Sequence, residues 1–486
     1  MKRIFTFIFF LALLISSFAF PCTIISGKTK DNMVWAGNNE DFCFDFNTYF
    51  NVLPSEGKLL GVISFTYGSP ESFIQGGVNE HGLFFDFNSL PEEPLSNYKD
   101  WDNKEDFQAG EDALVVHIIR NCSTVLDVME LLKKYRIRGL LYAQMHVADK
   151  LGNLAVINAR GVRFAKRDYQ VSTNFNVFSD KPSSGDKMCW RYPIAERLLK
   201  ENGVSLESFR DVLDATQQPR IVGTIYSNVI NLTTGDVYNY YAGDFKNVYH
   251  FNVKEMLKKG KKSYLWRSLF PDAPVVRVWE TYLAKGTEEA IQLFLQIQNT
   301  LSEKRKSETL RHIFSSCLLV VNKYADAKVF FNEWLKENED RDKLTNFYNG
   351  IIHLTNGNYA KAKHYFSEQT KANEIDEVAQ RSSDSYVKKF LEKLSGRMPS
   401  GANTRFELKG FQDAKFICVF GISWLPASNF LLKTQEGWAA DFALPPGKHH
   451  YAFLVDGEMI LDPANPEKEE INTEDGRFLL NIKIVK

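Results

Sequence analysis

The sequence is poor in cysteine, carries almost no net charge and has no long apolar run after its first twenty residues. Six cysteines in 486 residues are too few for a disulfide-dense secreted scaffold. The formal net charge of −1 gives no electrostatic case for binding nucleic acid or an anionic membrane surface. The cysteines and the nine histidines show no CxxC, HExxH or similar ligand spacing, so we predict neither a metal site nor a cofactor.

The first residues have the pattern of a secretory signal peptide. Lys2 and Arg3 form a short positive region, residues 4–15 are an apolar run, and Ser17-Phe18-Ala19 fits a signal-peptidase site. No later stretch approaches the roughly 18 apolar residues needed to span a membrane. We therefore predict a leader at residues 1–21 and a mature protein that is secreted or periplasmic. Because Pro21 is a poor residue directly before a signal-peptidase cut, a second trimming or a self-cleavage step would be needed to expose the next residue.

Cys22, the residue after this leader, is a candidate nucleophile. Once it becomes the first residue of the mature chain, it carries both a thiol and a free α-amine. An α-amine has a reference pKa of about 8, so near neutral pH a useful fraction is unprotonated and can take the proton of the thiol. Cys22 then has its base built in, and no distant histidine is required.

The rest of the chain changes pattern twice. Residues 22–252 alternate strand-like runs with Gly and Asn turns and a few helices, which favours helices packed on the outer faces of stacked sheets. Residues 253–395 read as helices, and 346–366 resemble a single tetratricopeptide unit, too little for a free-standing array. Residues 396–403 have the composition of a linker. The evenly spaced short strands of residues 404–486 favour a β-sandwich.

Several separated motifs give residues 22–252 a resemblance to a known group of enzymes. They are Cys22-Thr23, Gly37-Asn38-Asn39-Glu40-Asp41, Gly77-Val78-Asn79-Glu80-His81-Gly82-Leu83, Ser172-Thr173-Asn174-Phe175 and Arg191-Tyr192. In this order the segment resembles the choloylglycine-hydrolase and penicillin V acylase-like families of N-terminal-nucleophile amidohydrolases, and the acyl-coenzyme A:penicillin acyltransferase-like group. The resemblance implies an α+β fold with four layers, αββα. It also implies hydrolysis, or acyl transfer, at a linear carbon–nitrogen amide bond of a small N-acyl substrate.

The resemblance also assigns roles to particular residues. Cys22 would attack the amide carbonyl, and Asp41 would hold its α-ammonium group. The tetrahedral oxyanion needs fixed hydrogen-bond donors, which Asn174 and a donor near Asn79 would supply. Arg191 would be a cation near the thiolate or near a substrate carboxylate.

Asn38 and Asn39 are assigned to substrate binding, and Asn38 departs from the family pattern. Asn38 occupies the position where the family usually has an arginine next to the nucleophile. The thiolate then lacks one nearby positive charge, so the pKa of Cys22 should be less depressed than in the family.

The last segment resembles the glycogen-binding, early-set immunoglobulin-like domains. The resemblance rests on residues 406–411, 421–424, 437–438, 446–453, 455–457 and 461–466. Such domains stack sugar rings on exposed aromatic side chains. This chain has Met459 where the family usually has its second stacking tryptophan, and Ala452 where it has a lysine, whereas Trp424 is kept. We therefore interpret the module as a structural or interaction domain rather than a working α-glucan binder.

Two classes of function fit these observations. The first is a secreted cysteine amidohydrolase whose partner is a small N-acyl amide. The second is a secreted scaffold, in which a degenerate hydrolase domain and the two later segments bind protein or glycan at the cell surface. Asn38 and the proline before Cys22 favour the second class. The acyl and amine groups of a substrate are not specified, because residues 66–75 and 90–108 have no readable pattern.

Overall fold

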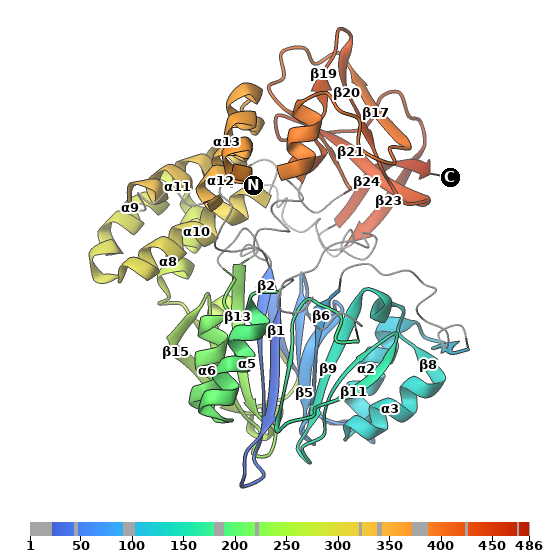
Figure 1. Ribbon diagram of the computed structural model, residues 1–486, viewed down its shortest axis with the longest axis vertical. Helices are drawn as coiled ribbons and strands as arrows, with labels where there is room; N and C mark the ends of the chain where they lie inside the picture. The colour runs from blue at the N-terminus through green and yellow to red at the C-terminus, as the bar shows by residue number, and fades with distance from the viewer. Residues whose placement is uncertain are drawn as a thin grey trace. The chain divides into compact units, whose positions relative to one another are not determined.

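The computed structural model describes residues 22–42, 47–90, 103–178, 189–218, 223–319, 323–337, 343–371, 387–422, 426–473 and 476–485. The chain divides into two compact units, one ending at Glu280 and the other beginning at Thr281 (Figure 1). All the candidate residues from Cys22 to Arg191 belong to the first unit. In the part of the chain that the structure describes, no helix is both long and apolar enough to cross a lipid bilayer.

One half of the first unit is a six-stranded antiparallel sheet in the order β12-β1-β2-β13-β14-β15. Its strands are β1 (Thr23–Lys28), β2 (Val34–Phe42), β12 (Tyr169–Ser172), β13 (Gly223–Asn231), β14 (Asp236–Tyr241) and β15 (Asp244–Asn252). Helices α5 (Arg191–Asn202) and α6 (Leu206–Ala215) cover one face. Ser205 caps α6 by accepting from the Ser208 backbone, and Phe209, Val212 and Leu213 recur at helical spacing, so this stripe is buried against the sheet.

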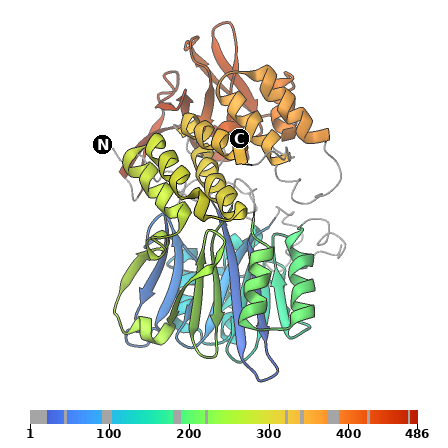
Figure 2. The same ribbon diagram turned by 90° about the vertical axis from the view of Figure 1, so that its left-hand side faces the viewer.

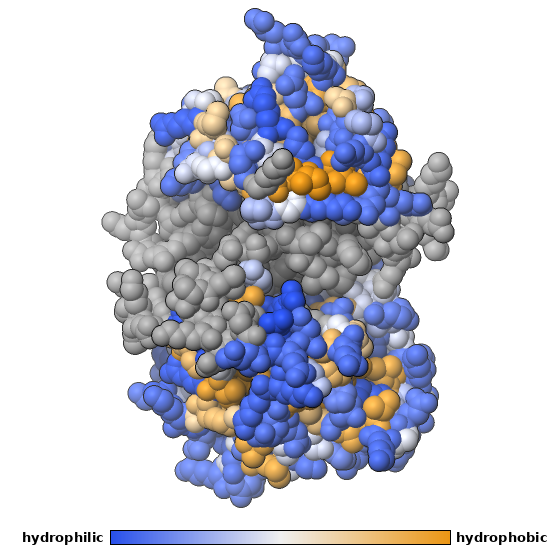
Figure 3. All heavy atoms as spheres, turned by 90° about the vertical axis from the view of Figure 1, so that its right-hand side faces the viewer, coloured by the Kyte–Doolittle hydropathy of each residue, from blue (hydrophilic) through white to orange (hydrophobic). Residues whose placement is uncertain are grey.

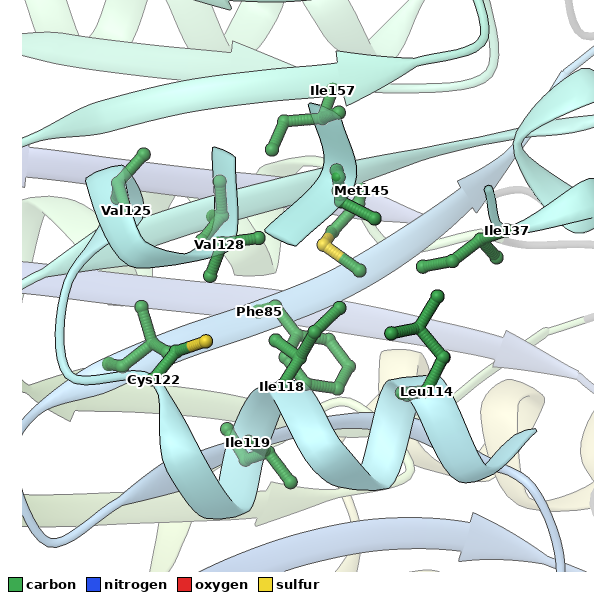
Figure 4. Packing of buried hydrophobic residues seen from close by; sticks show 14 of the residues in the cluster. Phe85, Leu114, Ile118, Ile119, Cys122, Val125, Val128, Ile137, Met145 and Ile157 are labelled. Atoms are coloured by element: carbon green, nitrogen blue, oxygen red, sulfur yellow. The ribbon is translucent and has the colours of Figure 1, made fainter. Parts of the chain in front are cut away.

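The other half is an eight-stranded antiparallel sheet in the order β11-β10-β9-β6-β5-β4-β3-β16. Its strands are β3 (Thr48–Leu53), β4 (Val62–Tyr67), β5 (Ile74–Asn79), β6 (Leu83–Ser89), β9 (Ala143–Asp149), β10 (Leu154–Asn158), β11 (Gly161–Phe164) and β16 (Lys262–Leu265). Helices α2 (Glu111–Asn121) and α3 (Val125–Lys134) bury Leu114, Ile118 and Val128 against Phe85 and Met145 of this sheet (Figure 4). The surface on this side is largely hydrophilic with scattered apolar patches (Figure 3). The short strand β7 (Glu105–Asp106) precedes α2 and pairs with β8 (Tyr135–Arg136), which follows α3 and is followed by η2 (Arg138–Leu141).

The two sheets face each other, so the first unit has four layers. His146 on β9 contacts the hydroxyls of Ser26 on β1 at 2.7 Å and Ser172 on β12 at 2.9 Å, which joins the sheets through buried side chains. The rings of Phe65 on β4 and Tyr226 on β13 also meet, at 5.9 Å between centroids. Figure 1 shows α5 and α6 on one side of the two sheets and α2 and α3 on the other. The order is helices, sheet, sheet, helices, which is the αββα arrangement expected.

The first unit continues past the predicted boundary at Asn252. Helix α7 (Val253–Leu257), strand β16 and the short helix η3 (Trp266–Leu269) follow it, and β16 pairs with β3 at the edge of the eight-stranded sheet. The Trp266 ring stacks on Tyr226 at 4.4 Å between centroids. The boundary predicted at residue 252 is therefore too early. A strand of four residues, with a helix shortly before it and a short helix directly after it, is too short to show a strand periodicity in the sequence.

Helix α8 (Pro274–Lys285) spans the boundary between the two units, and further helices follow it in the second unit, drawn as yellow and orange ribbons in Figure 2. They are α9 (Thr287–Ile297), η4 (Gln298–Thr300), α10 (Glu303–Leu319), α11 (Tyr324–Glu337), α12 (Lys343–Thr355) and α13 (Tyr359–Lys371), and α10 packs on α11 as α12 does on α13. Between α12 and α13, Gly357 has φ of 72°, a conformation that glycine adopts without strain. A Cβ on Gly350 would lie 2.3 Å from the Phe366 ring, so these two helices are interlocked. The likeness of this hairpin to a tetratricopeptide unit stays a prediction.

Two small sheets form the end of the second unit. The first has the order β17-β20-β19 and the second β18-β21-β24-β23, with β22 added to β21. Their bounds are β17 (Thr404–Lys409), β18 (Ile417–Phe420), η6 (Pro426–Asn429), β19 (Leu432–Lys433), β20 (Gly437–Phe442), β21 (Gly447–Val455), β22 (Glu458–Ile460), β23 (Lys468–Thr473) and β24 (Gly476–Val485). Phe406, Val419, Trp438, Tyr451 and Phe453 share one core, so the sheets pack face to face. The likeness to glycogen-binding domains stays a prediction; Trp424 lies outside the described residues.

Candidate active site

Cys22 lies immediately before β1, where both sheets reach it. The pairing of Thr23 with Asn39 makes Glu40 of β2 the cross-strand neighbour of Cys22. The Cys22 sulfur donates to Glu40 Oε1 at 3.4 Å, and the residue is only 2% exposed. From the other sheet, Asn88 Nδ2 on β6 donates to the Cys22 carbonyl oxygen at 3.2 Å. The thiol is therefore fixed by backbone pairing on one side and by an asparagine of the facing sheet on the other.

Glu40 is itself held by two further groups. The Tyr67 hydroxyl on β4 donates to the same Oε1 atom that the thiol contacts. Asn38 Nδ2 donates to Oε2 at 3.4 Å, and Asn228 Nδ2 donates to Asn38 Oδ1 at 2.9 Å, which turns the Asn38 amide nitrogen toward Glu40. Burial raises the pKa of Glu40 to about 7, although the three hydrogen bonds that it accepts oppose the shift.

A second cluster lies on the opposite face of β2, because successive side chains of a strand alternate. Arg191, at the start of α5, lies 3.3 Å from Asp41 Oδ2 and donates to Asn174 Oδ1 at 2.7 Å. It also donates to the Thr23 hydroxyl at 3.3 Å, and the Thr224 hydroxyl donates to Asp41 Oδ1 at 2.5 Å. The side chains of Arg191 and Asp41 are 3% and 0% exposed. The structure thus brings together three of the predicted residues, Asp41, Asn174 and Arg191.

The two clusters meet at the Cys22 sulfur. The backbone N–H of Asp41 donates to this sulfur, which places the thiol at the junction between the Glu40 side and the Asp41 side of β2. Burial raises the pKa of the Cys22 thiol well above its usual value, and the charges of Glu40, Asp41 and Asp86 raise it further. The side-chain charges that act on the sulfur are those of carboxyl groups, and Asn38 adds no positive charge beside them.

Asn39 and Asn79 do not face Cys22, which corrects two predicted assignments. Asn39 Nδ2 donates to the Leu213 carbonyl at 2.8 Å, and its Oδ1 accepts from Ser227, so this side chain ties β2 to α6. Asn39 points away from Cys22 because side chains alternate along β2, which puts Asn39 and Asp41 on one face and Glu40 on the other.

Asn79 is committed to a turn at the far end of its strand. Its Nδ2 donates to the carbonyls of Ile119 and Cys122, and its Oδ1 accepts from the backbone of His81 and Leu83. Asn79 pairs with the first residue of β4, whereas Tyr67 is the last, which separates them by about 16 Å at roughly 3.3 Å per residue. Asn79 therefore holds α2 against the sheet and cannot help an oxyanion at Cys22.

Three contacts of the site were not predicted from the sequence. Glu40 lies within the motif of residues 37–41. The alternation of side chains along a strand would by itself have placed Glu40 with Asn38 on the Cys22 side of β2. Tyr67 and Asn88 carry no local signal, because they reach Cys22 only through the stacking of the two sheets.

The described cysteines are all buried free thiols: Cys22, Cys122, Cys189, Cys317 and Cys418, while Cys43 lies outside the described residues. Cys189 differs from Cys22 in its electrostatics. Burial alone would raise its pKa, but the Arg191 guanidinium and the backbone N–H groups of Arg191 and Tyr192 lower it. Among the described residues, no cluster of histidine, cysteine and carboxylate side chains has the geometry to hold a metal ion.

Comparisons with known proteins gave matches of backbone structure. The chain matches no protein-family model and no curated protein sequence. It is similar to penicillin V acylase from Agrobacterium tumefaciens, with 16% sequence identity and a TM-score of 0.39 over 50% of this chain and 90% of that chain. It is also similar to a variant of conjugated bile acid hydrolase from Clostridium perfringens, with 14% identity and a TM-score of 0.38 over 50% of this chain and 97% of that chain. A mutant of the same hydrolase has 12% identity and a TM-score of 0.36 over 50% of this chain and 96% of that chain.

Proposed function

We propose that the first unit is a cysteine amide hydrolase, or an acyltransferase, that acts on a small N-acyl amide outside the cytoplasm. The observation that carries the proposal is the placing of Cys22. Its thiol lies at the end of β1 between a carboxyl group, Glu40, and the buried chain of Asp41, Arg191 and Asn174. A nucleophile beside a proton acceptor, with an orienting network behind it, is the arrangement that acyl transfer requires.

In this proposal the Cys22 sulfur attacks the amide carbonyl and Asn174 donates to the oxyanion. Arg191 is a positioning residue, because its guanidinium joins Asn174 Oδ1 to Asp41 Oδ2 and so fixes the direction of the Asn174 amide. Asn88 positions the Cys22 backbone through its carbonyl oxygen. Departure of the amine leaves a thioester on Cys22, and water or an acyl acceptor then clears it.

Buried acceptors near Cys22 support removal of the leader. Asp86 Oδ2, Asn88 Oδ1 and Asn228 Oδ1 have no hydrogen-bond partner among the described residues. Buried polar atoms are normally satisfied, and an α-ammonium group at Cys22 would bring three donors and a positive charge into a region of carboxyl groups. The α-amine is also the proton acceptor that the sequence predicts.

The test is mass spectrometry of the secreted protein together with turnover of N-acyl amides. We expect a mature chain that starts at Cys22, release of amine from a panel of N-acyl p-nitroanilides, and an acyl adduct on Cys22. Cys22→Ser should lose turnover, since general acid–base and nucleophilic groups are worth about 10²-fold or more. Cys189→Ser is the matched control, because it removes the other thiol of this region and should retain turnover. An acyl adduct on Cys189, or full activity of Cys22→Ser, would contradict the proposal.

The scaffold alternative has one observation in its favour. Burial, together with three carboxyl groups, raises the pKa of the Cys22 thiol, so little of it is thiolate in the unprocessed chain. If the secreted protein keeps residues before Cys22 and shows neither turnover nor acylation, the scaffold is the better account. Binding of glycan or protein by the last segment would then be the property to measure.

A further inference from the structure

We infer that Glu40 is a catalytic group of this site: it takes the proton from the Cys22 thiol during attack and returns it to the leaving amine. The inference rests on the proposed function and names the base within it. It gives the α-amine a different task from the one predicted, namely to supply positive charge.

The geometry that carries the inference is direct contact. Glu40 Oε1 lies 3.4 Å from the Cys22 sulfur, which is within hydrogen-bonding distance of a thiol, and the two residues are cross-strand neighbours. Tyr67 and Asn38 each donate to the carboxyl group, one at each oxygen, so its orientation is fixed from β4 and from β2 itself. A general base must lie within reach of the proton that it removes, and Glu40 does so without any rearrangement.

The neighbouring charges favour Glu40 over the α-amine as the acceptor. The charged or titratable groups that face Glu40 come from four directions: Cys22 just before β1, Tyr67 from β4, Asp86 from β6 and Tyr226 from β13, with Asp41 next to Glu40 on β2. The negative charges of these carboxyl groups favour the protonated form of an α-amine at Cys22, and an amine that is already protonated cannot accept the thiol proton. A carboxyl group with a pKa near 7 is ionised in part and is matched to proton transfer at that pH.

The steps balance with no added reagent. As the Cys22 sulfur bonds to the amide carbon, its proton passes to Glu40 and the carbonyl electrons move to oxygen. The carbon–nitrogen bond then breaks, Glu40 returns the proton to the nitrogen, and the amine leaves behind a thioester. Water repeats the sequence: it gives a proton to Glu40, bonds to the carbonyl carbon, and Cys22 leaves with the proton from Glu40 as a thiol.

The experiment compares Glu40→Gln with Asp86→Asn, both in a Cys189→Ser background. Because Cys43, Cys122, Cys317 and Cys418 remain, alkylation is followed by mass spectrometry of the peptide that holds Cys22. Gln keeps the shape of Glu40 and can still accept from Tyr67. Asp86→Asn removes a buried carboxyl group of the same neighbourhood, which accepts a hydrogen bond from the Phe87 backbone N–H. The two readouts are kcat/KM on N-acyl p-nitroanilides and the rate at which iodoacetamide alkylates Cys22.

The two readouts should move in opposite directions for Glu40→Gln. We expect kcat/KM to fall by about 10²-fold or more, because the base is lost. Alkylation at pH 7 should become about tenfold faster or more, because loss of a negative charge beside the sulfur lowers the pKa of the thiol. Asp86→Asn should speed alkylation less than Glu40→Gln does, and its fall in kcat/KM should be smaller than that of Glu40→Gln, because Asp86 does not contact the sulfur. Tyr67→Phe should move the acid limb of kcat/KM to higher pH, because the lost hydrogen bond had lowered the pKa of Glu40.

Each other outcome has a definite meaning. If Glu40→Gln keeps the turnover of the parent, or if turnover and alkylation fall together, Glu40 is not the base, while the proposed function stands on the activity of the parent. If the parent itself shows no turnover and no acyl adduct on Cys22, the proposed function fails, and this inference fails with it.

Discussion

Replacement of Arg191 by Met should destabilise the first unit by about 3–5 kcal/mol, because it leaves a buried carboxylate without its cation. Arg191 and Asp41 are almost fully buried and lie 3.3 Å apart. Coulomb's law at this distance gives about 5 kcal/mol for an effective dielectric constant of 20, in agreement with that range. The loss should be smaller at pH 5 than at pH 8. Burial raises the pKa of Asp41 well above its usual value although the charge of Arg191 opposes this, and loss of that charge raises the pKa further; the stability of the variant therefore falls as pH rises toward the folded-state pKa.

Urea unfolding followed peptide by peptide with hydrogen–deuterium exchange measures this loss in the first unit alone. The matched variant is Asp41→Asn combined with Arg191→Met, which removes both charges. We expect the double variant to regain at least 1 kcal/mol over Arg191→Met, as coupled neighbours do. A loss below 1 kcal/mol for Arg191→Met, or strictly additive effects of the two changes, would refute the view that this pair is the electrostatic centre of the β2–α5 contact.

Two further predictions concern other parts of the molecule. Asn79→Ala should cost about 1–3 kcal/mol of unfolding free energy, since its turn and the end of α2 lose buried hydrogen bonds, and should leave kcat/KM unchanged; a loss of turnover with normal stability would return Asn79 to the site. Lys393 is buried, donates to the Phe430 carbonyl at 2.9 Å, and burial lowers its pKa to about 7. The unfolded state then binds more protons than the folded state between pH 7 and about 10, so the second unit should become more stable by up to about 1.4 kcal/mol per pH unit. Lys393→Met should abolish this rise in thermal denaturation, and an unchanged slope would show that Lys393 is not its source.

Much of the fold was predictable because its signals are local. Strand alternation, helical spacing and turn residues depend on neighbours a few positions away, and they predicted stacked sheets with helices outside in residues 22–252. The edge strand β16 was not predicted, because its four residues are too few to show an alternating pattern. It is a strand only because β3 offers it a partner more than two hundred residues earlier in the chain.

The candidate site also has a part that local sequence signals predict and a part that depends on contacts distant in sequence. The sequence alone determined the chemistry on offer: a cysteine after a leader, and on β2 an alternation that puts Asn38 and Glu40 on one face and Asn39 and Asp41 on the other. It could not distinguish a donor from a turn residue at Asn79, because the two uses of an asparagine differ only in what lies around it.

Only the tertiary structure decided which of these groups work together. Tyr67 and Asn88 come from the facing sheet and Arg191 from a helix packed behind β2, and each reaches its partner across the core. Hydrogen bonds and charge interactions act over a few ångströms of space, whatever the distance along the chain. The pKa of Glu40, and with it the choice of base for Cys22, is therefore a property of the packed sheets, since burial between them is what raises it.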